Sequence, residues 1–169
     1  MSAIKMMEEP GHVGALLIGL AGSVAMGASA GIDSGVFAVL RGAALLPAMV
    51  LVVTLLVVPA LYVSASMMGV AIRLPELSAA VALGLRSSGV AALGLVGPVL
   101  FLLASSSSSQ VTWLLVAVVL LVTALLGLRS IYVQLFAHRD APGLLPLYLS
   151  WSLLVLGIGA KLVLQNLLL

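Results

Sequence analysis

The chain has 169 residues, of which 63% are hydrophobic and only 7% are charged, with seven Lys and Arg against five Asp and Glu. Water-soluble proteins carry about 25% charged residues, so this composition and a mean hydropathy of +1.36 exclude a soluble domain. The net charge of +2 is not gathered into a basic cluster, which excludes the usual footprint of nucleic-acid binding. We therefore expect the lipid bilayer to surround the protein, and residues 1–169 to form a single transmembrane domain.

Long stretches of the sequence contain no charged side chain, because the charges are confined to a few short segments. A hydrocarbon core about 30 Å thick requires about 20 apolar residues in a helix. We predict an all-α integral membrane bundle of five transmembrane helices, with spans at about residues 11–32, 42–72, 87–104, 111–128 and 144–164. The fourth span is expected to extend towards residue 137. A lead-in helix from residue 75, which lies at the membrane interface or enters the membrane obliquely, is expected before the third.

Small residues recur at every fourth position through the first span. The row consists of Gly11, Ala15, Gly19, Ser23, Gly27, Gly31 and Gly35. Such a row forms one ridge of a helix, and small residues on a ridge let another backbone approach closely. From Ala15 to Gly35 we expect the row to be a tight helix–helix interface, within the chain or with a partner. Generic packing of a weakly hydrophobic span is the alternative.

Prolines interrupt the second span at Pro47 and Pro59. A proline removes a backbone donor and crowds the carbonyl four residues earlier, so Pro59 predicts a kink near Leu55. Neighbouring helices commonly accommodate such a kink. A broken helix that lines a transport path is the alternative interpretation.

The charges between the spans predict how the chain is oriented. With five spans, one side of the membrane holds Lys5, Arg73, Arg86, Arg129 and Arg139, and the other holds Arg41 and Lys161. Because cytoplasmic loops carry the excess of Lys and Arg, we expect a cytoplasmic N-terminus and an external C-terminus. The expected location is the cell inner membrane, which the chain crosses several times.

Several motifs follow one another between about Gly27 and Gln134, after the glycine-spaced first span. They are Arg41-Gly42-Ala43 before Pro47, Leu51-Val52-Val53-Thr54-Leu55-Leu56 before Pro59-Ala60-Leu61-Tyr62-Val63, Gly97-Pro98-Val99-Leu100-Phe101 before a serine-rich turn, and Gly127-Leu128-Arg129. In these motifs the chain resembles a group of uncharacterised bacterial polytopic membrane proteins related in layout to the Yip-type family. The resemblance implies five spans with a cytoplasmic N-terminus, and it implies no established activity.

The residues needed for catalysis or metal binding do not occur in a recognisable pattern. His12 and His138 fall at predicted helix ends, and the carboxylates are scattered over termini and loops. No carboxylate pair has metal-ligand spacing, and the two-histidine zinc motif is absent. We therefore expect no catalytic residue, no cofactor and no metal site.

Ionisable groups inside a span are costly and therefore mark function or a specific contact. The candidates for a transport role or a polar contact are Arg86, Lys161 and Asp33. Arg86 would be partly submerged if its helix begins at Pro75, whereas Lys161 can extend towards the outer headgroups. Asp33 would need a partner such as Arg41 if the first helix continued to Gly35. Anchoring at the membrane interface, or a local turn for Asp33, is the alternative.

Three functions remain compatible with the sequence. The favoured hypothesis is a non-catalytic membrane subunit or scaffold whose partners are other membrane proteins or further copies of itself, joined through the small residues of the first span. A small channel or permease component is the second. A membrane enzyme that acts on lipid is the third.

Overall fold

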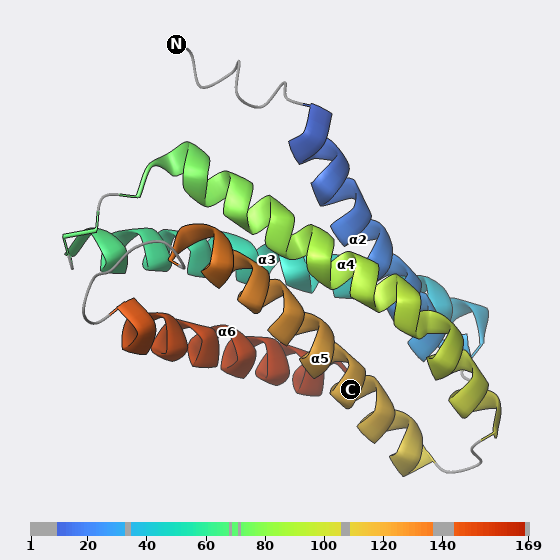
Figure 1. Cartoon of the computed structure of the whole chain (residues 1–169). Coiled ribbons are helices and arrows are strands. Elements are labelled where there is room, and N and C mark those ends of the chain that lie inside the picture. Colours follow the sequence, from blue (N-terminus) through green and yellow to red (C-terminus); the bar gives the residue numbers. More distant parts are fainter. Residues whose placement is uncertain are drawn as a thin grey trace.

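The computed structural model describes residues 10–32, 35–67, 69–70, 72–105, 109–136 and 144–167, which form an all-α bundle (Figure 1). Its helices are α2 (Pro10–Ala30), α3 (Val36–Met67), α4 (Leu74–Ser105), α5 (Ser109–Leu135) and α6 (Leu144–Leu167). All five helices are long and apolar enough to cross a membrane. The predicted all-α bundle of five such helices is confirmed, and the fold is that of a multi-pass membrane protein.

The helix α3 begins at Val36, before Gly42, where the second span was expected to begin. Gly35 has a φ of +94° and is exposed. Glycine adopts this left-handed conformation without the steric cost of a side chain, which allows the chain to reverse directly after α2. Gly35 therefore belongs to a turn and not to the helix-packing row in which it was predicted.

Two of the helices continue through internal prolines. The helix α3 includes Pro47 and Pro59, and α4 includes Pro98. The N-terminal half of α4 was expected as a lead-in that lies at the membrane interface or enters the membrane obliquely. Instead it is continuous with the rest of α4, and Leu77 and Ala80 in this half are buried in the core. The helix α4 therefore contributes to the bundle along most of its length.

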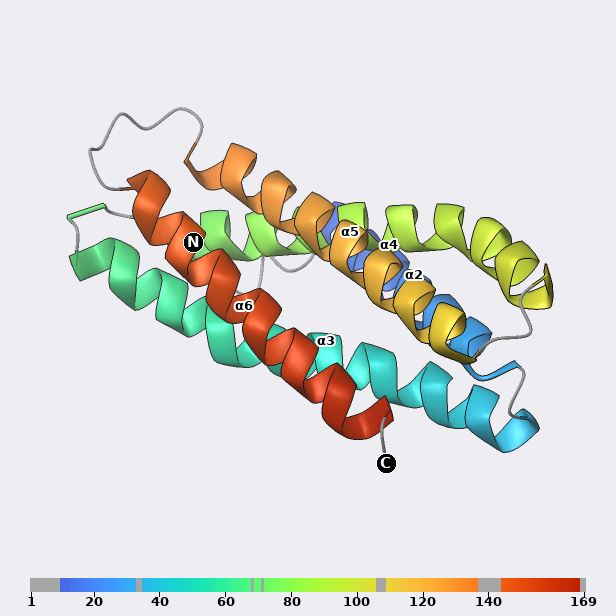
Figure 2. The ribbon, with the colours of Figure 1, turned by 90° about the horizontal axis from the view of Figure 1, so that it is seen from below.

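The helices α2 and α4 form the centre of the arrangement. They cross each other in Figure 1, α3 packs on α2, and α5 packs on α4. The helix α6 contacts α3 and, over a shorter region, α5, and in Figure 2 it crosses in front of α3. Neighbours in sequence thus run antiparallel, and α2 and α4 run parallel.

Glycines determine how closely α2 and α4 approach. A Cβ atom added at Gly22 would lie 2.5 Å from the Cα of Gly89, and one added at Gly19 would lie 2.8 Å from the carbonyl oxygen of Leu85. Real Cβ atoms essentially never come this close to other atoms. The two backbones are therefore in direct contact, a geometry that small residues permit between membrane helices.

Another part of the same row packs on α3. Gly27 lies against Gly42, and a Cβ atom added at Gly31 would lie 2.5 Å from the carbonyl carbon of Ala38. Ala15 and Ser23 are also buried. The small-residue row from Ala15 to Gly31 is thus covered by helices of the same chain, which leaves a partner no access to it.

The glycine contact generates a first prediction about stability. We expect Gly22→Ala to destabilise the folded bundle by about 1–3 kcal/mol, because the added methyl group overpacks the contact with Gly89. The matched control is Gly14→Ala in the same helix, where an added Cβ meets nothing within 4 Å. Thermal unfolding in detergent measures both variants. Equal midpoints for the two would contradict the proposed close contact.

The membrane orientation predicted from the charges can be tested at the first residue of α3 and the first residue of α4. The side chains of Val36 and Leu74 are 77% and 63% exposed, at the α2–α3 and α3–α4 turns. Because the sequence contains no cysteine, single Val36→Cys and Leu74→Cys variants give clean labelling. With a cytoplasmic N-terminus, a membrane-impermeant maleimide added to intact cells should label the Val36→Cys variant alone. Labelling of the Leu74→Cys variant alone would reverse the orientation.

Candidate functional site

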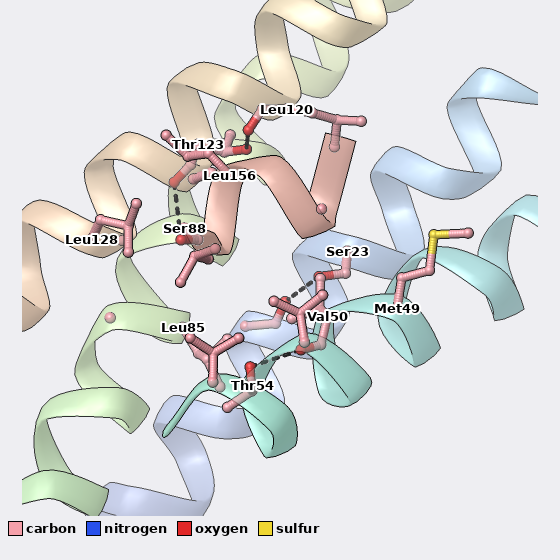
Figure 3. Close-up of a pocket in the computed structure, with 18 of the residues that line it drawn as sticks. Ser23, Met49, Val50, Thr54, Leu85, Ser88, Leu120, Thr123, Leu128 and Leu156 are labelled. Atoms are coloured by element: carbon pink, nitrogen blue, oxygen red, sulfur yellow. Dashed lines mark hydrogen bonds between the residues drawn. The ribbon is translucent and has the colours of Figure 1, made fainter. Parts of the chain in front are cut away.

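A cavity of about 560 Å³ lies inside the bundle, and all five helices contribute to its wall (Figure 3). Binding pockets for small molecules usually measure about 300–1,000 Å³. Leu85 and Ser88 of α4 line the cavity. Leu85 and Gly89 contact Gly19 and Gly22, which lie in the middle of α2. The cavity therefore lies at the height of the middle of α2, a helix long and apolar enough to cross a membrane.

The wall of the cavity is mainly hydrocarbon, and no charged side chain is among the residues that line it in the described part of the chain. Its apolar surface comes from residues such as Val50, Leu85 and Leu156, which Figure 3 shows on three different helices. Leu85 lines the cavity whereas Arg86 does not, and Ala160 lines it whereas Lys161 does not. A wall of this kind favours an apolar occupant over an ion.

Four hydroxyl groups also belong to the wall, but each donates its proton to a backbone carbonyl. Ser23 donates to Gly19 at 3.0 Å, Thr54 to Val50 at 2.7 Å, Ser88 to Thr123 at 2.9 Å and Thr123 to Leu120 at 3.0 Å. These bonds are drawn as dashed lines in Figure 3. Membrane helices commonly satisfy Ser and Thr in this way. The hydroxyls consequently offer no spare donor to a ligand.

The bond between Ser88 and Thr123 also joins α4 to α5. A Cβ atom added at Gly127 would lie 3.0 Å from the carbonyl oxygen of Gly84, and it would collide with the Ser88 hydroxyl. Glycines at both Gly84 and Gly127 therefore allow the two helices to come close enough for the Ser88 hydroxyl to reach the neighbouring backbone. This contact fixes one side of the cavity.

Trp151 lines one end of the cavity, and together with Tyr148 it holds α6 in place. The indole nitrogen of Trp151 donates to the carbonyl oxygen of Val57 at 2.9 Å, and the Tyr148 hydroxyl donates to the carbonyl oxygen of Leu128. The Tyr148 ring lies 5.4 Å from that of Trp151 and 5.1 Å from that of Tyr132, centroid to centroid. These separations are typical of favourable aromatic pairs. The start of α6 is thus bonded to both α3 and α5.

The other end of the cavity is open towards the surroundings of the bundle. Beyond Trp151, α6 continues along the cavity to Gly159 and Ala160. Among the lining residues, only Ala117 and Leu121 of α5 and Ala160 of α6 are exposed. The mouth therefore lies between the N-terminal half of α5 and the C-terminal half of α6, and in a membrane it faces lipid sideways.

Arg86 is located outside the cavity, on the outer face of α4. Its neighbour Leu85 contacts Gly19, and Gly89 contacts Gly22, so Arg86 is level with the middle of α2. The Arg86 side chain is exposed at that height. The sequence predicted partial submersion of this arginine, and the packing positions it about halfway across the bundle.

The other predicted polar candidates are not brought together with Arg86. Lys161 is exposed next to the cavity mouth, on α6. Asp33 lies outside the described residues, as do His138 and Asp140, and the structure does not describe the side chain of His12. Among the side chains that the structure does describe, no group of His, Cys, Asp or Glu is arranged to hold a metal ion.

Sequence reasoning did not anticipate the cavity. Its residues are ordinary apolar or hydroxyl side chains that are spread over all five helices. The available signal was indirect: Gly84 and Ser88 are one turn apart on α4, as are Thr123 and Gly127 on α5. Small and hydroxyl residues at this spacing indicate a close helix pair, but they do not reveal an empty space beside it.

Comparisons with protein-family models, curated proteins and solved structures found no significant match. The resemblance to the Yip-type layout thus remains a prediction from the quoted motifs. The proposals about function therefore rest on the geometry of the described residues.

The attachment of α6 generates a further prediction. Trp151→Phe keeps an aromatic ring in the core but removes the donor to the carbonyl oxygen of Val57. We expect a loss of about 0.6 kcal/mol, and at most about 1.7 kcal/mol, which is the range measured for hydrogen bonds between membrane helices. Thermal unfolding in detergent measures the change. A variant as stable as the natural protein would show that this bond does not hold α6.

Proposed function

We propose that the protein is a non-catalytic integral membrane subunit that packs against a transmembrane helix of a different protein, and that the outer face of α4 forms the contact. The observation that carries this proposal is the exposed Arg86 side chain halfway across the bundle. The function expected from the sequence is kept, but its contact surface moves from α2 to α4, because the small-residue row of α2 is covered within the chain.

The depth of Arg86 follows from the length of α2. This helix, Pro10–Ala30, has 21 residues, which at about 1.5 Å per residue cover about 32 Å, close to the roughly 30 Å hydrocarbon core. The middle of α2, near Gly19 and Gly22, must then lie near the middle of the bilayer. Arg86 packs at this height, about 15 Å from either interface.

An arginine at this depth is costly when lipid surrounds it. Insertion measurements give a cost of about 2.5–3.5 kcal/mol for an arginine at the centre of a single helix, and simulations give more. An arginine near a helix end lowers this cost by extending to the headgroups, but the distance from the bilayer centre is too long for Arg86 to do so fully. A carboxylate from a partner helix would remove the cost by pairing with the guanidinium group.

The residues around Arg86 form a surface that suits a helix. Along α4, the outer face continues with Val90, Leu93, Gly97 and Phe101, and all four are exposed. Their spacing of three or four residues aligns them on one face. A Cβ atom added at Gly97 meets nothing within 4 Å, so another helix could approach the backbone there.

A different protein fits this surface better than a second copy. In a twofold-symmetric pair the same surface meets itself, so two Arg86 side chains would approach each other. Glu76 is the one carboxylate whose side chain the structure describes, and it lies near the start of α4, far from the depth of Arg86. The partner that we propose therefore carries an Asp or Glu near the middle of its transmembrane helix.

A channel or permease component remains the second hypothesis. The cavity supports it less well, because its wall carries no charge and its described hydroxyls are already bonded. A membrane enzyme that acts on lipid ranks third, since no set of reactive groups is gathered within the described residues at the cavity.

Arg86→Gln tests the proposed partner contact. With the tagged protein extracted gently from its native membrane, we expect a stoichiometric partner in native mass spectrometry, and at least about a tenfold loss of that partner in Arg86→Gln. Such a loss corresponds to about 1.4 kcal/mol, well within the strength of a buried charge pair. Gly97→Leu, which adds bulk to the same face, should have a similar effect.

The matched control is Arg41→Gln, since Arg41 is also exposed but lies beside Gly42, at the end of the bundle where α2 contacts the start of α3. This variant should retain the partner. A natural protein that purifies without any partner, or an Arg86→Gln variant that keeps it in full, would refute the proposal.

A further inference from the structure

We propose that the cavity inside the bundle binds one acyl chain of a phospholipid, which enters sideways from the bilayer through the gap between α5 and α6. This inference rests on the cavity alone and is independent of any partner at the outer face of α4. It gives the protein a lipid-binding site in addition to a protein-binding surface.

The chemistry of the wall determines what fills the cavity. Apolar cavities in proteins stay dry, because a buried water needs several polar partners. Here the four described hydroxyls donate to backbone carbonyls, and no lining residue is charged. These hydroxyls can still accept a bond but have no proton left to donate, so the cavity offers water and ions too few hydrogen bonds to replace those lost from bulk solvent.

The location of the mouth determines which apolar molecule is available. The exposed lining residues Ala117, Leu121 and Ala160 all lie at the gap between α5 and α6, at the depth of the bilayer core. Acyl chains are the molecules that surround the protein at this depth. A volume of about 560 Å³ is large enough for a chain-like ligand.

The charge next to the mouth favours a phospholipid over an uncharged lipid. Lys161 follows Ala160 directly and is exposed. A lysine side chain can extend its ammonium group towards the interface while its hydrocarbon stem remains in the apolar region. A lipid whose chain occupies the cavity can therefore place its phosphate towards Lys161.

Trp151 reports directly on the contents of the cavity. It lines the closed end, and only 8% of its surface is exposed. Lipids that stay outside the bundle reach at most the small exposed part of this indole, whereas a chain inside the cavity would touch its buried face, so the quenching that counts is the part that filling the cavity removes. Bromine atoms on an acyl chain quench tryptophan fluorescence only at short range, so quenching of Trp151 measures entry of the chain.

The experiment uses the full chain in vesicles, with Trp113→Phe as the background so that Trp151 is the remaining tryptophan. We expect vesicles of phosphatidylcholine with brominated chains to quench at least half of the emission, on the order of a twofold loss relative to unbrominated vesicles. Absence of quenching would overturn the proposal, because the cavity residues are unaltered in this protein.

A matched pair of variants tests whether the quenching comes from the cavity. Gly159 lines it and Gly157 does not, and an added Cβ meets nothing within 4 Å at either position. Gly159→Phe should fill the open part of the cavity and restore most of the emission, whereas Gly157→Phe should leave the quenching unchanged. Equal quenching in both variants would refute entry through this cavity. If Gly159→Phe does not fold, Ala124→Phe replaces it, because Ala124 also lines the cavity.

The source of the chain is tested by a second arm. A brominated free fatty acid is added to unbrominated vesicles that contain the same Trp113→Phe protein. Quenching by the brominated phospholipid supports the proposal. Quenching by the fatty acid alone would refute a phospholipid as the ligand and would assign the cavity to free fatty acids.

Discussion

The direct backbone contact between α2 and α4 is the constraint on which the other features depend. Because Gly22 and Gly89 have no side chains, the two helices meet at their midpoints. The length of α2 fixes this meeting point near the centre of the bilayer. The same contact thereby fixes the depths of Arg86 and of the cavity, since Leu85 and Ser88 of α4 lie within one turn of it. A shift of α4 along α2 would change both depths together.

The cavity arises because the helices are held together unequally. Glycines draw α2, α3, α4 and α5 into close pairs, whereas α6 is bonded through Tyr148 and Trp151 near its start. Beyond these two anchors, α6 lies along the open side of the cavity. Large rings with donors at their edges fill one end tightly, but none of the α6 side chains that the structure describes fills the other in this way. The cavity is therefore closed at one end and open between α5 and α6 at the other.

The two proposed sites differ in whether their polar groups are satisfied within the protein. In the cavity, each described hydroxyl is satisfied by a carbonyl of the protein, so the wall behaves as hydrocarbon. On the outer face of α4, the Arg86 charge is exposed at a depth where lipid offers no counter-charge. The first arrangement suits an acyl chain, and the second suits a partner with a carboxylate.

The sequence by itself determined the class of fold. Five long apolar stretches predict five membrane helices, because in lipid a helix satisfies its backbone within one segment. The row from Ala15 to Gly31 likewise predicted a tight helix contact. Only the tertiary structure decided that this row faces two helices of the same chain, that Gly35 lies in a turn and that Arg86 points outwards at the centre. The physical reason is that helix formation depends on local composition. The depth of a residue, the side on which a helix is covered and the presence of a cavity depend instead on how distant segments pack together.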